Sequence, residues 1–485
     1  MGSWTRMQRM ASLTVGAVGG AAGFWYASRQ WNQRQVHASW TTNFEVSKCG
    51  KWDYNWDHRD PRSLVEPVGD NVDPVVQNRY NEKLDKKRTR VTRHLILVRH
   101  GQYNMDGRTD AERYLTEKGR KQAACSGERL KQLGFDFDKI IRSTMTRAQE
   151  TAKIISGSLP ELKLHDDAML EEGAPIPPEP PVGHWRPEVS QFFEDGARIE
   201  AAFRKYFHRA EPDQKQDTYT LVVCHANVIR YFVCRALQFP PEAWLRISLG
   251  HASITWISVM DDGRVTLRTL GETGHMPKEL LSRPSNQTKA RGTRNLILIR
   301  HGQYNLDGRN DSERYLTEVG QKQVALTANY LKRLGVKFDR IVRSTMTRAR
   351  ESAKIISESF PGLKLLDEPL LIEGTPIRPD PPSSSRHSDS EIATTHARIE
   401  AAFRKYFHRG DPTVQKQGDT YTPVVCHANV IRYLVCRALQ IPPEAWLRMS
   451  LAHASLTWIA IGNKGRVSLR SLGEASHIPP ELQSR

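Results

Sequence analysis

Cysteine is scarce in this sequence, and its six cysteines include no CxxC pair. Four of them lie in apolar runs as two copies of one pattern, so we expect buried thiols rather than a disulfide framework or a metal site. These four are Cys224, Cys234, Cys426 and Cys436. Zinc-finger spacings and RNA-recognition signatures are also missing. A nucleic-acid partner is therefore not expected, although the net charge is +17.

Acidic residues are missing from the start of the chain, where the first is Glu45. Residues 10–28 contain no charged side chain at all. A helix of that length would extend about 28 Å, which is close to the hydrocarbon thickness of a bilayer. The arginine-flanked, acid-free start is also typical of a mitochondrial targeting segment. We predict a basic segment at 1–9 and a membrane anchor at 10–28, with a cleaved targeting peptide as the alternative.

One long repeat organises the rest of the 485 residues. The motif RHGQYN begins at Arg99 and again at Arg300, and CHANVIRY begins at Cys224 and again at Cys426. An offset near 201 residues makes each unit a whole domain and not a solenoid repeat. The boundaries that we predict are a tether at 29–90, domain A at 91–283, a polar linker at 284–293 and domain B at 294–485.

Within each unit, apolar runs alternate with helical patterns. In domain A we expect strands at 94–98, 139–143 and 221–225, and helices from Thr116 to Gly134, from Thr146, and over 227–237. This alternation predicts two consecutive three-layer α/β/α domains, each with a mostly parallel central sheet. Ligands of such sheets bind beyond the carboxyl ends of the strands, and this is where His100 and His225 fall.

The residues at these positions suit phosphoryl transfer. His100 offers a nucleophilic imidazole beside Arg99, and Arg147 adds a second guanidinium matched to phosphate geometry. His225 can donate to a phosphoryl oxygen, and Glu172 can protonate the leaving group and then activate water. Each residue alone has an ordinary structural explanation, but the same set returns in domain B at preserved spacing.

These motifs resemble the histidine phosphatase superfamily, also called the phosphoglycerate-mutase-like family. The stretches RSTMTRAQET and CHANVIRYFVCRALQFPPEAWLR most resemble its mitochondrial serine/threonine-protein phosphatases. The resemblance implies a phosphohistidine intermediate, phosphorylated protein substrates, location at the outer or inner mitochondrial membrane, and neither metal nor organic cofactor.

The resemblance also assigns roles to residues. In domain A it implies His100 as the phosphate acceptor, Glu172 as the acid and base, and Arg99, Arg147 and His225 as phosphate ligands. The matching residues in domain B are His301, Glu373, Arg300, Arg348 and His427. Residues 52–57 match a WDxNWD motif through which the family member forms homo-oligomers. Its matching positions are Trp52, Asp53, Asn55, Trp56 and Asp57.

Two other functions remain open. One is a small-molecule phosphatase or mutase of the phosphoglycerate-mutase type, and the other is a membrane scaffold that binds phosphoproteins without turnover. Domain B also departs from domain A. It keeps all five site residues but replaces PVGHWRPE and EDG by the polar stretch PPSSSRHSDSEIATTHA. Because this stretch follows the acid/base loop, we expect domain A to be the better catalyst.

Overall fold

The structure is a computed structural model, and it describes residues 51–69, 72–182, 185, 187–281, 292–384, 387–410 and 418–485. The predicted basic segment and membrane anchor lie outside these residues, as does most of the predicted linker. Within the described ranges, no helix is both long and apolar enough to span a membrane. The predicted domain boundaries stay a prediction, and we refer below to repeat A and repeat B.

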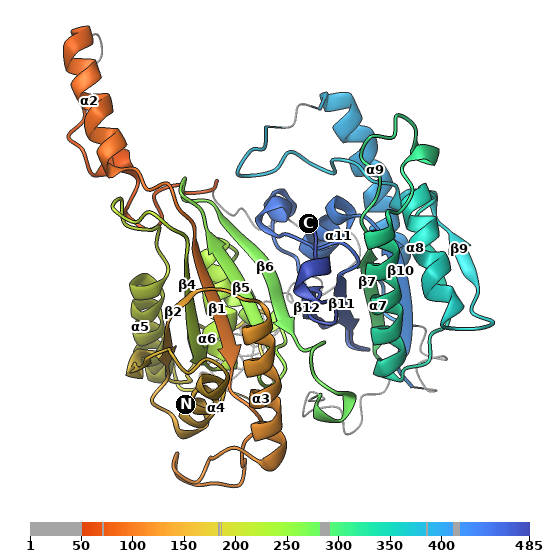
Figure 1. Cartoon of the computed structure of the whole chain (residues 1–485), viewed down its shortest axis with the longest axis horizontal. Coiled ribbons are helices and arrows are strands. Elements are labelled where there is room, and N and C mark those ends of the chain that lie inside the picture. The colour runs from red at the N-terminus through yellow and green to blue at the C-terminus, as the bar shows by residue number, and fades with distance from the viewer. Residues whose placement is uncertain are drawn as a thin grey trace, which may run out of the picture. The chain divides into compact units, whose positions relative to one another are not determined.

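The two repeats build matching sets of strands and helices (Figure 1). The strands of repeat A are β1 (Arg93–Arg99), β2 (Phe137–Arg142), β3 (Leu164–Asp166), β4 (Thr218–Cys224), β5 (Ile254–Val259) and β6 (Val265–Glu272). Its longer helices are α3 (Glu117–Gln132), α4 (Thr146–Ser158), α5 (Val189–Tyr206) and α6 (Ala226–Ala236). Helix α2 (Pro74–Lys87) precedes repeat A and contains no buried residue.

Repeat B follows the same order. Its strands are β7 (Arg294–Arg300), β8 (Ile341–Arg343), β9 (Leu365–Asp367), β10 (Thr420–Cys426), β11 (Leu456–Ile461) and β12 (Val467–Glu474). Its longer helices are α7 (Glu318–Leu334), α8 (Thr347–Glu358), α9 (Asp389–Tyr406) and α11 (Ala428–Ala438).

The sheet of repeat A has the strand order β3-β2-β4-β1-β5-β6. Its first four strands are parallel, and β5 and β6 continue the sheet as antiparallel strands. Helix α3 contacts α4, and α5 contacts α6. Right-handed crossovers put these two pairs on opposite faces of the sheet. The prediction of an α/β fold with a mostly parallel sheet is confirmed.

Local sequence explains where the helices begin and end. Thr116 caps α3 by accepting a hydrogen bond from the Gly119 backbone N–H, as the sequence predicts. Gly134 follows the helix with φ of 63°, a left-handed conformation that glycine adopts without strain. Ala123 and Leu130 are buried on the same helix and pack toward the sheet. The four cysteines predicted to be buried are buried.

The two repeats share one sheet, which is a difference from the two separate sheets expected from the sequence. Leu270 of β6 pairs with Leu472 of β12, and this makes a twelve-stranded sheet. Arg246 donates to the Leu439 carbonyl at 2.7 Å, and its counterpart Arg448 donates to the Leu237 carbonyl at 2.8 Å. The seam between the repeats is therefore pseudosymmetric.

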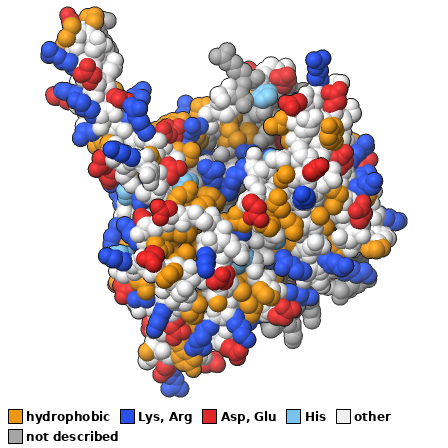
Figure 2. Space-filling view, viewed as in Figure 1, with side chains coloured by type: hydrophobic (Ala, Val, Ile, Leu, Met, Phe, Trp, Pro, Cys, Tyr) orange, Lys and Arg blue, Asp and Glu red, His pale blue; other side chains and the backbone are white. Residues whose placement is uncertain are grey.

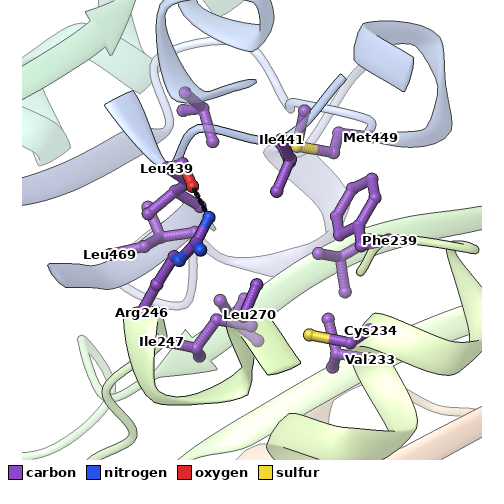
Figure 3. Close-up of a pocket in the computed structure, with 13 residues that line it drawn as sticks. Val233, Cys234, Phe239, Arg246, Ile247, Leu270, Leu439, Ile441, Met449 and Leu469 are labelled. Atoms are coloured by element: carbon purple, nitrogen blue, oxygen red, sulfur yellow. Dashed lines mark hydrogen bonds between the residues drawn. The ribbon is translucent and has the colours of Figure 1, made fainter. Parts of the chain in front are cut away.

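A small apolar pocket lies at this seam, and both repeats line it (Figure 3). Phe239 and Ile247 contribute from repeat A, and Ile441 and Met449 occupy the matching positions in repeat B. Elsewhere on the surface, basic and acidic side chains are mixed over the face shown in Figure 2.

Candidate active site

His100 follows directly after β1, at the carboxyl end of the parallel strands. Its backbone N–H donates to the Cys224 carbonyl at 3.0 Å, which ties it to the end of β4. The side chain is buried. The sequence therefore places this imidazole correctly at the sheet edge where ligands of parallel sheets bind.

The hydrogen bonds of His100 define its reactive nitrogen. Its Nδ1 lies 2.8 Å from the Gly101 carbonyl oxygen, which only accepts, so Nδ1 carries the proton and Nε2 holds the lone pair. Burial lowers the pKa of His100 well below its ordinary 6.5, and electrostatic interactions with His225, Arg99 and Arg147 lower it further. His100 is thus a neutral imidazole with a free nucleophilic nitrogen at Nε2.

Glycine at position 101 is required by close backbone packing. A Cβ on Gly101 would lie 2.5 Å from the carbonyl oxygen of Gly119, in the first turn of α3. A Cβ on Gly119 would in turn lie 1.9 Å from the Gln102 carbonyl oxygen. The RHG loop can therefore approach the start of α3 only if both positions are glycine.

A second imidazole, His225, faces the first. It precedes α6, and its ring centroid lies 5.1 Å from that of His100. Its Nε2 lies 2.8 Å from Ser143 Oγ, whereas its Nδ1 is buried and has no hydrogen-bond partner among the described residues. Burial and the nearby Arg147 and Arg99 lower the pKa of His225 well below 6.5, so this ring is also neutral.

Two arginines complete the positive side of the site. Arg147, in the first turn of α4, is buried, and its guanidinium lies 4.9 Å from the centre of the Tyr103 ring. Its Nη1 reaches Asp110 at 3.4 Å. The Nε atoms of Arg99 and Arg147 are both buried, and neither has an acceptor in the part of the chain that the structure describes. Together with Nδ1 of His225 and Nε of Arg230, they are four unsatisfied nitrogens in one site, an arrangement that suits an anion with several oxygens.

Glu172 lies in the loop after β3, within reach of α6. Its Oε1 accepts from the Asn227 backbone N–H at 3.1 Å. Burial raises the pKa of Glu172, although Arg99 and Arg230 act in the opposite direction. A carboxyl with a raised pKa is suited to donate a proton to a leaving oxygen.

Helix α5 holds the loop that carries Glu172. Arg198 donates to the carbonyl oxygens of Glu171 at 2.6 Å and Glu172 at 3.3 Å. Asp195 accepts from the Ala174 backbone N–H at 2.8 Å, and it also pairs with Arg198. The backbone on both sides of the acid is thereby fixed from one helix.

Repeat B assembles the same groups. The His301 and His427 ring centroids are 5.1 Å apart, and His301 Nδ1 lies 2.8 Å from the Gly302 carbonyl oxygen. Arg348 is buried over the Tyr304 ring. Burial raises the pKa of Glu373, as it does in the first site. The structure thus brings together each predicted set of five residues.

The two sites differ in detail. Arg348 Nε donates to His301 Nε2 at 3.2 Å, whereas the Arg147 Nε has no partner. Glu373 Oε1 accepts from the Gly374 backbone N–H at 3.3 Å, whereas Glu172 accepts from the Asn227 backbone N–H at the start of α6. In repeat B the attacking nitrogen is therefore already hydrogen-bonded, and the acid is held differently.

Sequence reasoning missed several residues of the site. His251 lies with its ring centroid 5.8 Å from His100, and Arg230 is a third buried guanidinium beside Glu172. Their counterparts in repeat B are His453 and Arg432. All four belong to motifs that occur in both copies, HASITW with HASLTW and CHANVIRY, so comparing the copies position by position could have identified them.

No set of three or more His, Cys, Asp or Glu side chains within the described ranges is arranged to hold a metal ion. The arginine Nε–H groups that have no partner among the described residues are donors, which are suited to oxygen anions.

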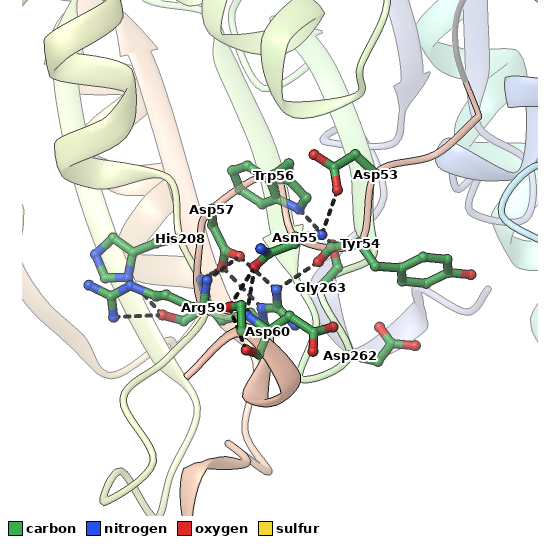
Figure 4. Close-up of polar contacts among 12 residues, drawn as sticks. Asp53, Tyr54, Asn55, Trp56, Asp57, Arg59, Asp60, His208, Asp262 and Gly263 are labelled. Carbon is green, nitrogen blue, oxygen red and sulfur yellow. Dashed lines mark hydrogen bonds and ion pairs between the residues drawn. The ribbon is translucent and has the colours of Figure 1, made fainter. Parts of the chain in front are cut away.

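The tryptophan–aspartate segment, residues 52–57, docks on its own chain (Figure 4). Asp57 pairs with Arg209 at 2.7 Å, and the Trp56 indole N–H donates to the Gly263 carbonyl at 2.8 Å. The Asn55 amide oxygen accepts from the Asp60 backbone N–H. The segment is thus folded and seated on repeat A.

The start of the same segment contacts both repeats. The Asp53 backbone N–H donates to Gln238 of repeat A at 2.9 Å. The Trp52 backbone N–H donates to Asp380 of repeat B at 2.7 Å, and the Arg448 guanidinium lies 4.8 Å from the centre of the Trp52 ring system. Trp52 is buried by these contacts. The segment therefore joins the two repeats.

The chain is similar to proteins of a known family. It matches the family described as the histidine phosphatase superfamily (branch 1) over residues 95–174, 179–273 and 296–473, and it belongs to this superfamily. A serine/threonine-protein phosphatase Pgam5, mitochondrial, of Drosophila ananassae is 54% identical over 282 residues, which cover 57% of this chain and 96% of the relative.

Another relative of the same name, from Drosophila mojavensis, is 52% identical over 287 residues, which cover 58% of this chain and 99% of the relative. Among solved structures, a phosphoglycerate mutase of Plasmodium falciparum is 36% identical, with 40% of this chain and 96% of that chain covered and a TM-score of 0.28. Each of the two Drosophila phosphatases is thus matched almost in full by little more than half of this chain.

Proposed function

We propose that the chain is a mitochondrial phosphoric monoester hydrolase that removes phosphate from phosphoserine and phosphothreonine, and also phosphohistidine, in proteins. One observation carries the proposal. A neutral His100 presents the lone pair of its Nε2 beside buried arginine N–H donors that have no acceptor among the described residues. The names of the relatives supply the substrate class.

In the first step, His100 Nε2 attacks phosphorus, and the bond from phosphorus to the serine or threonine oxygen breaks. Glu172 gives its proton to that oxygen, so a neutral hydroxyl leaves. Arg99, Arg147 and His225 hold the phosphoryl oxygens, where charge is concentrated during transfer. The step ends with a phosphohistidine and an ionised Glu172.

In the second step, Glu172 takes a proton from a water molecule whose oxygen attacks phosphorus. The bond between phosphorus and Nε2 breaks, and its electron pair returns to His100. Inorganic phosphate leaves, and the histidine is again neutral and the glutamic acid again protonated. A high pKa for Glu172 suits the first step, and the positive charge left around it suits the second.

Repeat A is the better catalyst in this proposal. The hydrogen bond from Arg348 to His301 Nε2 must break before attack, and Arg147 makes no such bond to His100. The acid/base loop of repeat B also lacks the aspartate that fixes its counterpart, because Thr395 replaces Asp195.

The paired substitution His100→Ala with His301→Ala tests the mechanism. We expect no hydrolysis of phosphoserine or phosphothreonine peptides by the double variant, with an unchanged circular dichroism spectrum. Each single variant should retain the activity of the other repeat, and His301→Ala should retain more. Near wild-type activity in the double variant would reject the mechanism.

Two controls separate the other functions. Interconversion of 2- and 3-phosphoglycerate faster than peptide hydrolysis would favour a small-molecule mutase. Binding of phosphopeptides without release of phosphate would favour a scaffold.

Membrane attachment and assembly complete the proposal. Residues 10–28 would anchor the chain in a mitochondrial membrane, because they are uncharged and long enough to cross it. Residues 52–57 would support a homo-oligomer. In repeat B, Arg409 is the exposed counterpart of the buried Arg209, and among the described residues no carboxylate pairs with it. Arg409 would therefore be open to the Asp57 of a second copy of the chain. Sedimentation of the chain with and without Asp57→Ala would test assembly.

A further inference from the structure

In each repeat, a histidine outside the predicted set supports the arginine that precedes the nucleophile. Arg99 Nη2 lies 3.1 Å from His251 Nε2, and Arg99 Nη1 donates to the Leu249 carbonyl at 2.6 Å. In repeat B, Arg300 Nη2 lies 2.8 Å from His453 Nε2. The arrangement therefore occurs twice in the chain.

The protonation of these histidines follows from their partners. Arginine has only donors, so Nε2 of each histidine must accept and the proton must sit on Nδ1. In repeat B this Nδ1 lies 2.9 Å from Ser484 Oγ, an acceptor for that proton. Burial lowers the pKa of both His251 and His453 to about 3, and the neighbouring arginine lowers it further. Both rings are neutral at any working pH.

The backbone beside each histidine is strained and reaches the nucleophile. Ala252 has φ of 53° and Ala454 has φ of 56°, in the left-handed region that side-chain-bearing residues rarely adopt. The Ala252 backbone N–H donates to the His100 carbonyl at 3.1 Å. The segment that contains His251 and Ala252 thus contacts both the arginine and the histidine of the RHG motif. Backbone strain of this kind is typical of functional sites.

We propose that His251 and His453 are positioning residues that orient Arg99 and Arg300 for the phosphoryl group. With one terminal nitrogen bound to a carbonyl and the other to the imidazole, the guanidinium plane is fixed. Its buried Nε–H stays available for a phosphoryl oxygen. A neutral histidine does this without adding another positive charge to a site that already holds three arginines.

This inference rests on the proposed phosphatase activity, and its test uses a chain with one working site. In the full chain carrying His301→Ala, we compare His251→Leu with His251→Gln, whose amide oxygen can still accept from Arg99. His165→Leu, at an exposed position of β3, is the control substitution. The readouts are KM and kcat for a phosphothreonine peptide, and the inhibition constant of orthovanadate.

We expect His251→Leu to raise KM and the orthovanadate inhibition constant about 10- to 100-fold, as for the loss of one hydrogen bond to a charged group. The kcat value should change less than KM, and His251→Gln should restore most of the loss. If the leucine variant binds orthovanadate as tightly as its parent, the inference is wrong. Equal losses in both variants, together with a lowered melting temperature, would show a purely structural histidine and also overturn it.

Failure of the proposed function gives a different pattern. In that case the His301→Ala parent hydrolyses no phosphopeptide. Calorimetric titration with inorganic phosphate of three chains, the parent and its His251→Leu and His251→Gln derivatives, then decides the positioning role. Weaker phosphate binding by His251→Leu alone supports it, and equal binding by all three chains overturns it.

Discussion

Asp57 and Arg209 form an ion pair in which both side chains are almost wholly removed from solvent, at 0% and 2% exposure. The carboxylate accepts from the Arg209 backbone N–H, from Nε and from Nη2, at 2.7–3.0 Å. Burial alone would raise the pKa of Asp57, but the bonds from Arg209 outweigh it and the pKa is lowered. A short segment ahead of repeat A is thus locked to it by one buried charge pair.

Breaking this pair should destabilise the chain strongly. Arg209→Ala removes the guanidinium that neutralises the buried Asp57 carboxylate and leaves it only the backbone N–H donors of residues 59 and 209. Losing the charge partner of a buried ion costs about 3–5 kcal/mol. The matched control is Arg409→Ala, at the exposed counterpart, which should change the free energy of unfolding by no more than about 0.5 kcal/mol. Urea unfolding followed by tryptophan fluorescence compares the two. Equal effects of the two substitutions would show that the segment does not stabilise the repeat.

A second charged feature lies at the seam between the repeats. Glu474 of repeat B accepts from the backbone N–H groups of Thr273 and Gly274 in repeat A. Glu272 of repeat A accepts from the Ala475 backbone N–H of repeat B at 3.2 Å. Burial, reinforced by the Glu474 charge, raises the pKa of Glu272 to about 7.

The raised pKa predicts how seam stability depends on pH. Between about pH 4.5 and 7 the unfolded chain has lost the Glu272 proton while the folded chain keeps it, so stability falls as pH rises through this window. The glutamine of the Glu272→Gln variant cannot ionise. As pH rises through this window, the unfolding free energy of the variant relative to that of the parent should therefore increase by about 1–3 kcal/mol. Glu279→Gln, at an exposed position, is the control. Parallel stability curves for parent and Glu272→Gln would contradict the prediction.

Much of the site could be predicted because it is local in sequence. His100 and His225 each follow an apolar run that becomes a buried parallel strand, β1 or β4, and this places both at one edge of the sheet. Predicted strand 94–98 lies within β1, and predicted helix 227–237 matches α6 to within one residue at each end. Because the same five residues recur in both repeats at preserved spacing, chance occurrence was not a satisfactory explanation for any of them.

The remainder depends on contacts between distant segments. His251 contacts Arg99 although the two are about 150 residues apart in the sequence, and no sequence pattern in either segment indicates that contact. Strands β5 and β6 were not predicted at all. They carry the seam, and the pairing of Leu270 with Leu472 depends on how two whole repeats meet. The docking of Trp52 between the repeats is of the same kind.

The raised pKa of Glu172 predicts the pH dependence of turnover. Glu172 must be protonated to release the alcohol, so kcat/KM should fall as pH rises through its pKa, which lies above the ordinary 4.5. The acid limb that protonation of His100 would cause lies well below pH 6.5. In the His301→Ala background, Glu172→Gln should lower kcat for a phosphoserine peptide about 10²- to 10⁴-fold and remove the alkaline limb.

The leaving group supplies a control for that variant. An aryl phosphate such as p-nitrophenyl phosphate releases an oxygen that departs without a proton, so Glu172→Gln should slow its first step much less. Burst kinetics separate that step from hydrolysis of the phosphohistidine. An equal loss of the first step for both substrates would exclude Glu172 as the proton donor.

Exchanging one residue between the repeats should move activity with it. Asp195 fixes the acid/base loop of repeat A through the Ala174 N–H and Arg198, and Thr395 stands at this position in repeat B. In the His301→Ala background, Asp195→Thr should lower kcat about 10-fold, since a small misplacement of a catalytic group is costly. In the His100→Ala background, Thr395→Asp should raise kcat, because Arg398 is already in place to pair with it. Steady-state rates with one phosphothreonine peptide measure both effects. If the Thr395→Asp chain is no faster than its parent, the activity of repeat B is limited by the hydrogen bond from Arg348 to His301 and not by the loop.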